Sequence, residues 1–200
     1  MNATAVAPVT LSNEYVTLEP LAAGHAAELE AAAVDGELWN FPYTRIPGQG
    51  EGAAYVDAAL KGQAEGRMLP FAVREASTGK VVGSTRYYDI DLGLPRLYIG
   101  YTWYAKAWQQ KHLNTACKQL LLEHAFDTLH CVAVAFNVDE MNGRSMHAVE
   151  HIGAQREGVL RAHKRRRDGS LRNTVAFSIL AEDWPNVENW LAMRLNKLAP

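Results

Sequence analysis

The stretch Trp103 to Lys118 reads WYAKAWQQKHLNTACK and joins a strand pattern to a helix pattern. On its N-terminal side, Leu97 to Tyr104 is rich in aromatic and β-branched residues, which is typical of a central strand, and Gly100 within it indicates a β-bulge. On its C-terminal side, Asn114 to His130 repeats apolar residues four positions apart, which predicts a helix. The fold is therefore organised around a loop that connects a central strand to a helix.

This loop has the properties of an anion-binding site. The first turn of a helix has unpaired N–H groups and the positive end of the helix dipole, so it favours a pyrophosphate. Lys111 adds a positive charge, and Asn114 or Thr115 is expected to be the N-cap residue. The glycine patterns of P-loop and Rossmann nucleotide sites are both absent from the loop. The sequence thus predicts a nucleotide-like ligand that is bound without either of these two glycine motifs.

The order of the remaining elements defines the fold class. Alternation and helical periodicity predict a strand, two helices, three strands, a helix, a strand, a helix, two strands and a last helix. The predicted strands are 11–18, 71–74, 81–88, 97–104, 131–138, 155–163 and 171–180, and the predicted helices are 24–34, 51–65, 114–130, 142–152 and 182–198. This order predicts an α+β (α/β) fold, in which helices flank a mixed, mostly antiparallel sheet of about seven strands with a central βαβ crossover.

Length, composition and charge narrow the class of protein. A chain of 200 residues with 48% hydrophobic and 21% charged residues fits a single domain over 1–200, with residues 1–10 expected to be flexible. The formal net charge of −2 argues against a general nucleic-acid binder. Since the sequence shows neither a membrane-spanning apolar run nor the pattern of a secretory signal, we expect a cytoplasmic protein. Cys117 and Cys131 are expected to be buried, reduced thiols.

A second feature is an aromatic segment in the loop between the first two predicted helices. Trp39, Phe41 and Tyr43 lie there close to Pro47 and Gly48, and helical periodicity does not explain them. They either plug the core or form the wall of a substrate pocket, and the sequence leaves both interpretations open.

Several short motifs become informative when they are taken together. The loop Gln109 to Asn114 reads QQKHLN and is followed by Thr115. Further motifs are Ile99-Gly100-Tyr101-Thr102-Trp103, Asn142-x-Arg144-Ser145 ending at Gly153-Ala154, and Glu157-Gly158-Val159-Leu160-Arg161 followed by Asp168-Gly169. With the order of elements, these motifs resemble the GNAT acetyltransferase superfamily over nearly the whole chain. The resemblance is strongest to its branch of ribosomal-protein N-terminal (Rim-type) acetyltransferases, in which the loop pattern is Gln/Arg-x-x-Gly-x-Gly/Ala.

The resemblance implies acetyl-CoA as the cofactor and co-substrate, and a sheet that splays between its fourth and fifth predicted strands. The pantetheine arm would lie beside the splayed strand, the pyrophosphate on the loop, and Asn142 would contact the cofactor from the other side. The implied cofactor-binding residues are Tyr101, Thr102, Trp103, Gln109, Gln110, Lys111, His112, Leu113, Asn114, Thr115 and Asn142. His112 stands where the family has glycine, and if the backbone there has a positive φ, a side chain costs about 1–2 kcal/mol.

Two further departures from the family concern the chemistry. Tyr98 stands where many members have a glutamate that acts as a base through water, so the base is not identified. Val149 stands where many have a tyrosine that protonates the leaving thiolate. Ser145, at the Asn-x-x-Ser position of the branch, is then the predicted catalytic acid, and its alternative role is capping or packing within its helix. The spare carboxylates are interpreted as surface residues; they are Glu37, Asp89 and Asp91.

The resemblance implies an N-acetyltransferase that passes the acetyl group directly to a primary amine, either a peptide or protein α-amine or a small-molecule amine. The lack of a strong base slightly favours an α-amine, which loses its proton more easily than a lysine-like amine. The predicted acceptor-binding residues are Trp39, Phe41, Tyr43, Arg86, Tyr88 and Tyr98. Neither nucleic acid nor a membrane is expected as a partner, and the chain is expected to be a monomer or a homodimer.

Three rival interpretations stay open. His147 to His151 matches the HxxEH pattern of inverted zinc peptidases, although no third ligand is identified and no metal is expected. The basic run Lys164 to Arg167 has three alternative interpretations: a solvated hairpin tip, a site that steers the phosphates of the substrate or CoA, or a nucleic-acid site. The departures at His112, Tyr98 and Val149 are compatible with a catalytically inactive acyl-CoA-binding module.

Overall fold

Residues 6–198, which the computed structural model describes, form one sheet of eight strands in the spatial order β1-β2-β3-β4-β5-β6-β8-β7. The strands are β1 Leu11–Ser12, β2 Val16–Pro20, β3 Met68–Glu75, β4 Val81–Asp91, β5 Arg96–Tyr104, β6 Ala133–Asp139, β7 Gln155–Arg165 and β8 Leu171–Leu180. All neighbouring strands are antiparallel except β5 and β6, which are parallel. The mixed, mostly antiparallel sheet that the sequence predicts is therefore confirmed.

The strand count differs from the prediction at the N-terminal end. The strand predicted at 11–18 is two strands, because the Asn13 side chain accepts hydrogen bonds from the backbone N–H groups of Tyr15 and Val16 (3.0 and 3.1 Å) and turns the chain back on itself. Of the segment predicted to be flexible, residues 1–5 lie outside the described part, and Val6 and Val9 pack against the larger hydrophobic cluster.

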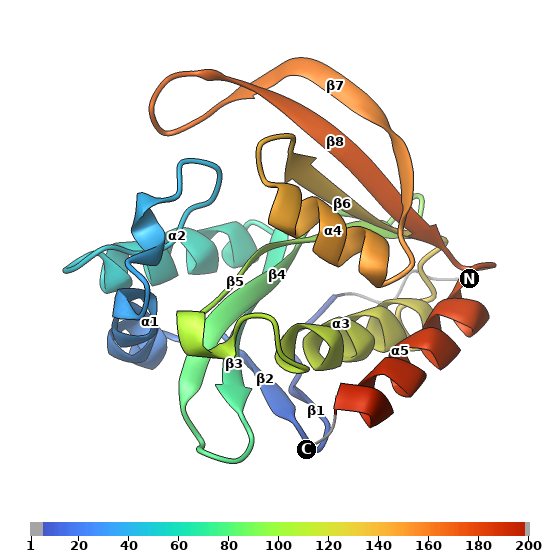
Figure 1. Cartoon of the computed structure of the whole chain (residues 1–200), viewed down its shortest axis with the longest axis horizontal. Coiled ribbons are helices and arrows are strands. Elements are labelled where there is room, and N and C mark those ends of the chain that lie inside the picture. The colour runs from blue at the N-terminus through green and yellow to red at the C-terminus, as the bar shows by residue number, and fades with distance from the viewer. Residues whose placement is uncertain (1–5, 199–200) are drawn as a thin grey trace.

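The five α-helices correspond to the five predicted helices. They are α1 Ala26–Val34, α2 Gly52–Ala64, α3 Leu113–Glu123, α4 Gly143–His151 and α5 Trp184–Leu198, and a π-helical turn at His124–Thr128 continues α3. The helices α1 and α2 lie on one face of the sheet, and α3 and α5 lie on the other (Figure 1). Ala72 and Val73 are neighbours in β3 but belong to different hydrophobic clusters, as the alternation of side chains along a strand requires.

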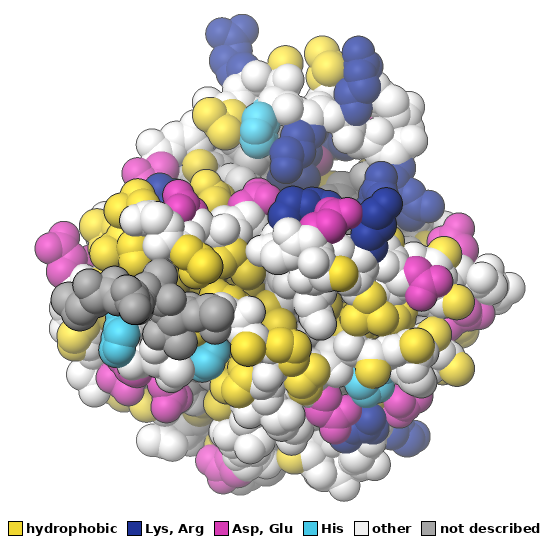
Figure 2. Space-filling view, turned by 180° about the vertical axis from the view of Figure 1, so that it is seen from behind, with side chains coloured by type: hydrophobic (Ala, Val, Ile, Leu, Met, Phe, Trp, Pro, Cys, Tyr) yellow, Lys and Arg dark blue, Asp and Glu magenta, His cyan; other side chains and the backbone are white. Residues whose placement is uncertain are grey.

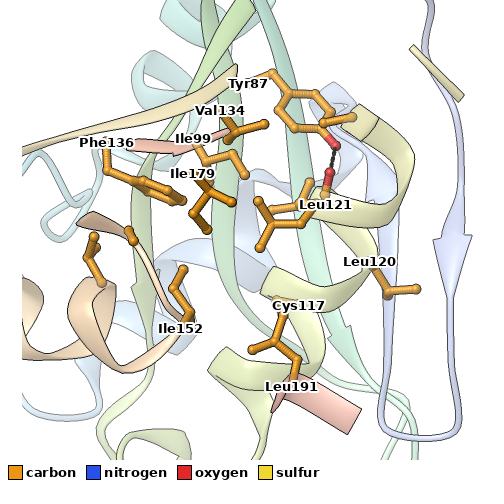
Figure 3. Packing of buried hydrophobic residues seen from close by; sticks show 14 of the residues in the cluster. Tyr87, Ile99, Cys117, Leu120, Leu121, Val134, Phe136, Ile152, Ile179 and Leu191 are labelled. Atoms are coloured by element: carbon orange, nitrogen blue, oxygen red, sulfur yellow. Dashed lines mark hydrogen bonds between the residues drawn. The ribbon is translucent and has the colours of Figure 1, made fainter. Parts of the chain in front are cut away.

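The larger cluster fixes α3 against the centre of the sheet. Inside it, the Tyr87 hydroxyl of β4 donates a hydrogen bond to the carbonyl of Leu121 in α3 (Figure 3). Both residues are fully buried, and Cys117 and Leu191 join α3 to α5 in the same view. The N-terminus of α3 is thus held at a fixed position relative to β4 and β5.

The sheet splays at its centre. β5 and β6 pair only between Arg96–Tyr98 and Ala133–Ala135, although β5 continues to Tyr104 and β6 to Asp139. Beyond Tyr98, the edge of β5 that faces β6 has no ladder partner. The predicted splay is therefore confirmed, and it creates a wedge between the two strands.

A bulge lies on β5 beside this wedge. Arg86 pairs with Gly100 and Ser84 pairs with Trp103, so two residues of β5, Tyr101 and Thr102, lie opposite the single residue Thr85 of β4. Tyr101 has a left-handed φ of 51°. The bulge that Gly100 indicates is therefore present. Gly100 itself is needed for packing, because a Cβ there would lie 2.7 Å from Cε1 of Tyr88.

The last two strands form a long hairpin that arches over the sheet end near α1 and α2 (Figure 1). β7 is almost entirely exposed, whereas Val175, Phe177 and Ile179 of β8 belong to the larger cluster. Lys and Arg side chains gather on this part of the molecule in the rear view (Figure 2). Among residues 6–198, none of the helices combines the length and apolar composition that a bilayer span requires.

Candidate active site

The first part of the loop between β5 and α3 is anchored to two other elements. The backbone N–H of Ala107 donates to the carboxylate of Asp35, the C-cap residue of α1 (2.7 Å). The side-chain amide of Gln109 donates to the carbonyl of Tyr104, the last residue of β5 (2.8 Å). This part of the loop is thus tied both to the sheet and to the first helix.

The first turn of α3 presents free backbone donors. The helix begins at Leu113 with His112 as its N-cap, so the predicted N-cap role of Asn114 or Thr115 is wrong. Because Leu113 is fully buried, the helix begins one residue before Asn114, the first residue expected to be a cap. The side chain of Asn114 instead accepts a hydrogen bond from the Tyr104 hydroxyl (3.3 Å). Within the described part of the chain, the N–H groups of the first three residues of α3 have no hydrogen-bond partner. They are available to an anion.

Backbone strain in the loop lies at Gln110 rather than at His112. His112 has a right-handed φ of −62°, and its ring lies 4.9 Å from the Tyr15 ring, so the cost expected from replacing glycine does not arise there. Gln110 has a left-handed φ of 61°. Lys111 is exposed, with its ammonium 5.0 Å from the centroid of the Trp108 ring. Its charge lies next to the helix N-terminus, as the sequence predicts.

The bulge residues face different sides of the sheet. The Thr102 hydroxyl contacts the Thr85 hydroxyl (2.8 Å) and accepts a hydrogen bond from the ammonium of Lys118 (3.0 Å). Lys118 is 4% exposed, and its burial lowers its pKa to about 8. Trp103 is buried against α2, where its indole N–H donates to the Tyr55 hydroxyl (3.0 Å). Of the predicted pantetheine-binding residues, Trp103 therefore has only its backbone to offer a cofactor.

The start of α4 lies on the other side of the wedge. Asn142 is its N-cap, and its side-chain oxygen accepts a hydrogen bond from the backbone N–H of Ser145 (3.1 Å). The half-buried Ser145 has a hydroxyl without a hydrogen-bond partner among residues 6–198. The neighbouring Arg144 donates to the side-chain oxygen of Gln109 and so links α4 to the β5–α3 loop.

These segments line an open cleft of about 310 Å³. It lies where the α1–α2 loop, the β5–α3 loop and α4 meet, and its lining residues are Gly36, Leu38, Phe41, Lys106, Gln109, Gln110 and Arg144. Two cationic side chains and two amides face it, which suits a phosphate-bearing ligand. The cleft brings predicted cofactor residues together with Phe41, a predicted acceptor residue.

A cluster of tyrosines surrounds Arg86 on the α2 face of β4 and β5. The Tyr88 ring lies 5.3 Å from the rings of both Tyr98 and Tyr101. The Arg86 guanidinium lies 4.7 Å from the Tyr101 ring and 4.8 Å from the Tyr55 ring. The structure thus brings together three predicted residues, Arg86, Tyr88 and Tyr98, next to the bulge.

The aromatic loop divides between two roles. Trp39 is half-buried and packs against the core of α1 and α2, whereas Phe41 is 37% exposed and its ring stacks 5.6 Å from that of Tyr43. The carbonyl of Trp39 accepts a hydrogen bond from Arg167 at the tip of the β7–β8 hairpin (3.3 Å). The hairpin and the aromatic loop therefore meet over this end of the sheet.

The basic run 164–167 is not uniformly solvated. Arg166 donates two hydrogen bonds to the Asp139 carboxylate at the end of β6 (2.7 and 2.8 Å), and the side chains are 7% and 1% exposed. Burial by itself raises the pKa of Asp139, but the hydrogen bonds from Arg166 and from the N–H of Met141 bring that pKa below its usual value. The solvated-tip interpretation is therefore wrong for Arg166, which fastens the hairpin to β6.

Sequence reasoning did not single out Lys118, Tyr55 or Asp139. Lys118 interrupts the buried surface of α3, and a lysine among buried helix positions is the signal that identifies it. Asp139 ends a buried strand and has its partner 27 positions away in the sequence. No pattern in the sequence pairs these two residues.

The remaining candidates are three exposed carboxylates and a pair of histidines. Glu37, Asp89 and Asp91 are exposed. The rings of His147 and His151 lie 3.7 Å apart, but residues 6–198 contain no group of three potential metal-binding side chains.

Comparison with known proteins identifies the class. The chain matches the acetyltransferase (GNAT) domain family over residues 16–155. The N-acetyltransferase p20 of Bacillus licheniformis, which is itself uncharacterized, is 25% identical over 186 residues, covering 88% of this chain and 98% of the relative. A crystal structure of a GCN5-related N-acetyltransferase from Brucella melitensis is 27% identical, with a TM-score of 0.87 over 96% of this chain and 87% of that chain.

A structure of Mycobacterium smegmatis RimJ in complex with CoA-disulfide shares the fold, with a TM-score of 0.79 and 23% identity over 94% of this chain and 95% of that one. The splayed sheet and the free N-terminus of α3 are thus features of an acetyltransferase. The chain belongs to the GNAT acetyltransferase family, whose members use acetyl-CoA as their co-substrate.

Proposed function

We propose that this enzyme transfers the acetyl group of acetyl-CoA directly to a primary amine, either a peptide α-amine or a small-molecule amine. The observation that carries the proposal is the unpaired edge of β5 beyond Tyr98, with its bulge at Tyr101, beside the free N–H groups of α3. An unpaired strand edge offers N–H and C=O groups to an amide-rich ligand arm, and a helix N-terminus offers donors to phosphates.

The residues present fit acetyl-CoA. The first turn of α3 and Lys111 would hold the pyrophosphate, and β5 beyond Tyr98 would hold the pantetheine amides. When bound, acetyl-CoA supplies an acetyl group activated as a thioester. A backbone N–H in the bulge would donate to the carbonyl oxygen of that group and stabilise the negative charge that develops there.

Direct transfer fits the state of the two cysteines. Cys117 and Cys131 are both buried, and burial raises their pKa values to about 12 and about 11. Such thiols are protonated at neutral pH and are poor nucleophiles. The amine itself is therefore the attacking group, and an α-amine suits a site without an identified base because its pKa is closer to neutral.

Ser145 is the proposed proton donor to the leaving thiolate, and the proton that the amine loses as the amide forms would restore the serine hydroxyl. Its backbone N–H is used by the Asn142 cap, and its hydroxyl has no partner within residues 6–198. A positioned proton donor contributes about 10²–10⁴-fold to a rate.

The alternative function is that the basic hairpin 164–167 binds a macromolecule. The structure weakens this alternative, because the charge of Arg166 is already neutralised by the Asp139 carboxylate.

The experiment is an assay of CoA release and product mass with short peptides and small amines as acceptors. We expect acetylated products that appear only with acetyl-CoA and an amine together. Acetyl-CoA binding without any product across both acceptor classes would identify an inactive acyl-CoA-binding module.

Variants of Ser145 test the proton donor. We expect Ser145→Ala to lower kcat at least about tenfold at saturating substrates, and Ser145→Thr, which keeps a hydroxyl, to retain most of it. Both variants should keep the affinity for acetyl-CoA and the melting temperature. A kcat of Ser145→Ala within about twofold of the wild type would leave Ser145 with a capping role only.

A further inference from the structure

Arg86 is a buried cation in the middle of the sheet. It lies on β4 opposite Gly100 of β5, and the whole residue is 4% exposed. Its guanidinium lies over the rings of Tyr55 and Tyr101, which lower the cost of burying the charge without neutralising it.

The hydrogen-bonding capacity of Arg86 is largely unused. No carboxylate of residues 6–198 lies within 4 Å of it, and its buried Nε has no hydrogen-bond partner there. The one polar contact of its side chain within the described residues is from a terminal nitrogen to the sulfur of Met68 (3.7 Å). A guanidinium has five donors, and a buried charge is costly unless it is paired, so Arg86 is suited to bind an anionic group.

The location of the site indicates where that anion comes from. Tyr101, whose ring lies against the guanidinium, is a bulge residue of β5 beyond Tyr98, and it is 37% exposed. Tyr88 and Tyr98 extend the aromatic cluster along the same two strands. Arg86 therefore has an exposed neighbour on the part of β5 whose outer edge is unpaired, which is where the proposed acceptor would meet the acetyl group.

We propose that Arg86 binds a carboxylate of the acceptor, and that the acceptor is a primary amine with a carboxylate roughly 5–10 Å from its nitrogen. The distance is one to two strand spacings of about 4.8 Å, because Arg86 lies one strand away from the unpaired edge of β5. A carboxylate offers the guanidinium two acceptors in one plane, which matches its fork of donors. The inference rests on the proposed amine acetylation and adds the chemical class of the acceptor.

The test compares matched acceptors and variants. The acceptors are 4-aminobutanoate, 5-aminopentanoate and 6-aminohexanoate, each against its carboxamide, and the readout is kcat/KM for acetylation. We expect the wild type to prefer the carboxylates about tenfold or more, and Arg86→Gln and Arg86→Met to show no preference. Arg96→Gln is the control, because Arg96 also lies over a tyrosine ring but at the start of β5, where that strand is still paired with β6; it should keep the preference.

A binding measurement separates this inference from the proposed function. Pentanoate, which has no amine, is titrated into the wild type and into Arg86→Gln, with and without CoA. Pentanoate binding that disappears in Arg86→Gln supports the carboxylate site even where none of the acceptors is acetylated. Equal use of acids and carboxamides, or no difference in pentanoate binding between the two proteins, would overturn it. A protein that binds pentanoate through Arg86 but not acetyl-CoA would contradict the proposed function alone.

Discussion

Arg86 on β4 and Arg166 in the β7–β8 hairpin are both buried arginines, one on each side of the wedge, but they differ in what surrounds the charge. Arg166 donates two hydrogen bonds to Asp139, so this region contains its own counter-ion. Around Arg86 the structure supplies tyrosine rings and no carboxylate within 4 Å among the described residues. We infer that the charge of Arg166 stabilises the fold, and we propose that the charge of Arg86 binds a ligand.

The Asp139–Arg166 pair should give the largest change in stability. Asp139→Asn leaves the Arg166 guanidinium buried without its counter-ion, and we expect it to lower the free energy of unfolding by about 3–5 kcal/mol in urea denaturation. Lys164→Ala, in the same hairpin as Arg166 but exposed, is the control and should change this free energy by less than about 0.5 kcal/mol. If Asp139→Asn lowered the free energy of unfolding by less than about 1 kcal/mol, the pair would contribute no more than an exposed ion pair.

The same pair predicts the direction of a pH effect. The pKa of Asp139 is lowered in the folded state, so its contribution to stability is present above the ordinary aspartate pKa of about 3.9 and is lost as the pH falls below it. The difference in unfolding free energy between wild type and Asp139→Asn should be constant from about pH 5 to 8 and shrink below about pH 4. A difference that grows on acidification would contradict the assignment.

Lys118 is a second buried cation with no carboxylate within 4 Å among residues 6–198, and replacing it should stabilise the protein. Its pKa is lowered from 10.5 to about 8, so the unfolded chain binds more protons between these values and stability rises with pH across that window. At pH 7 burial of the ammonium lowers the free energy of unfolding by its full amount, so Lys118→Met should raise that free energy by about 3 kcal/mol. This gain should decrease between about pH 8 and 10.5. Thermal unfolding of both proteins at several pH values measures it. A variant less stable than the wild type at pH 7 would show that the hydrogen bond from Lys118 to Thr102 outweighs the buried charge.

Arg86→Met should have a small effect on stability. Removing an unpaired buried charge favours the folded state, while losing two cation–π contacts opposes it, so we expect a net change below about 1 kcal/mol in urea denaturation. The contrast with Asp139→Asn is the point of the measurement. A loss of about 3 kcal/mol or more would mean that Arg86 is a structural residue like Arg166.

The smallest effect is expected in the loop between the two regions. Gln110→Gly removes the cost of a left-handed φ, but glycine also adds freedom to the unfolded chain, so the expected gain is below about 1 kcal/mol. His112→Gly, at a right-handed φ, is the control and should gain nothing. Differential scanning calorimetry compares the two. A higher melting temperature for His112→Gly than for Gln110→Gly would show that the strain lies at His112, where the family has glycine.

Local patterns predicted most of the fold. The aromatic run with Gly100 predicted both β5 and its bulge, because these depend on neighbouring residues, and helical spacing placed α3 to within one residue of its start. The N-cap prediction failed because burial of Leu113 outweighs the capping preference of Asn114 and Thr115. Likewise, the turn at Asn13 was not predicted, because it depends on the hydrogen bonds of one side chain and not on a pattern of alternating residues.

The site was predicted less completely, because its energetics depend on partners that lie far apart in the sequence. Arg86, Tyr88 and Tyr98 were expected near the acceptor, but the absence of a carboxylate beside Arg86 among the described residues is a property of the folded sheet alone. The pairing of Asp139 with Arg166 depends on how the hairpin arches back over β6. Sequence patterns report what each residue can do, and the tertiary structure decides which charges are neutralised.

The central claim is that the splayed edge of β5 and the first turn of α3 hold acetyl-CoA. Calorimetric titration of the full chain with acetyl-CoA, with desulfo-CoA and ATP as controls, tests it most directly. We predict one site of micromolar affinity, about −8 kcal/mol, for acetyl-CoA, similar binding of desulfo-CoA, and much weaker binding of ATP, which has no pantetheine arm. No binding of acetyl-CoA, or binding no tighter than that of ATP, would contradict the account.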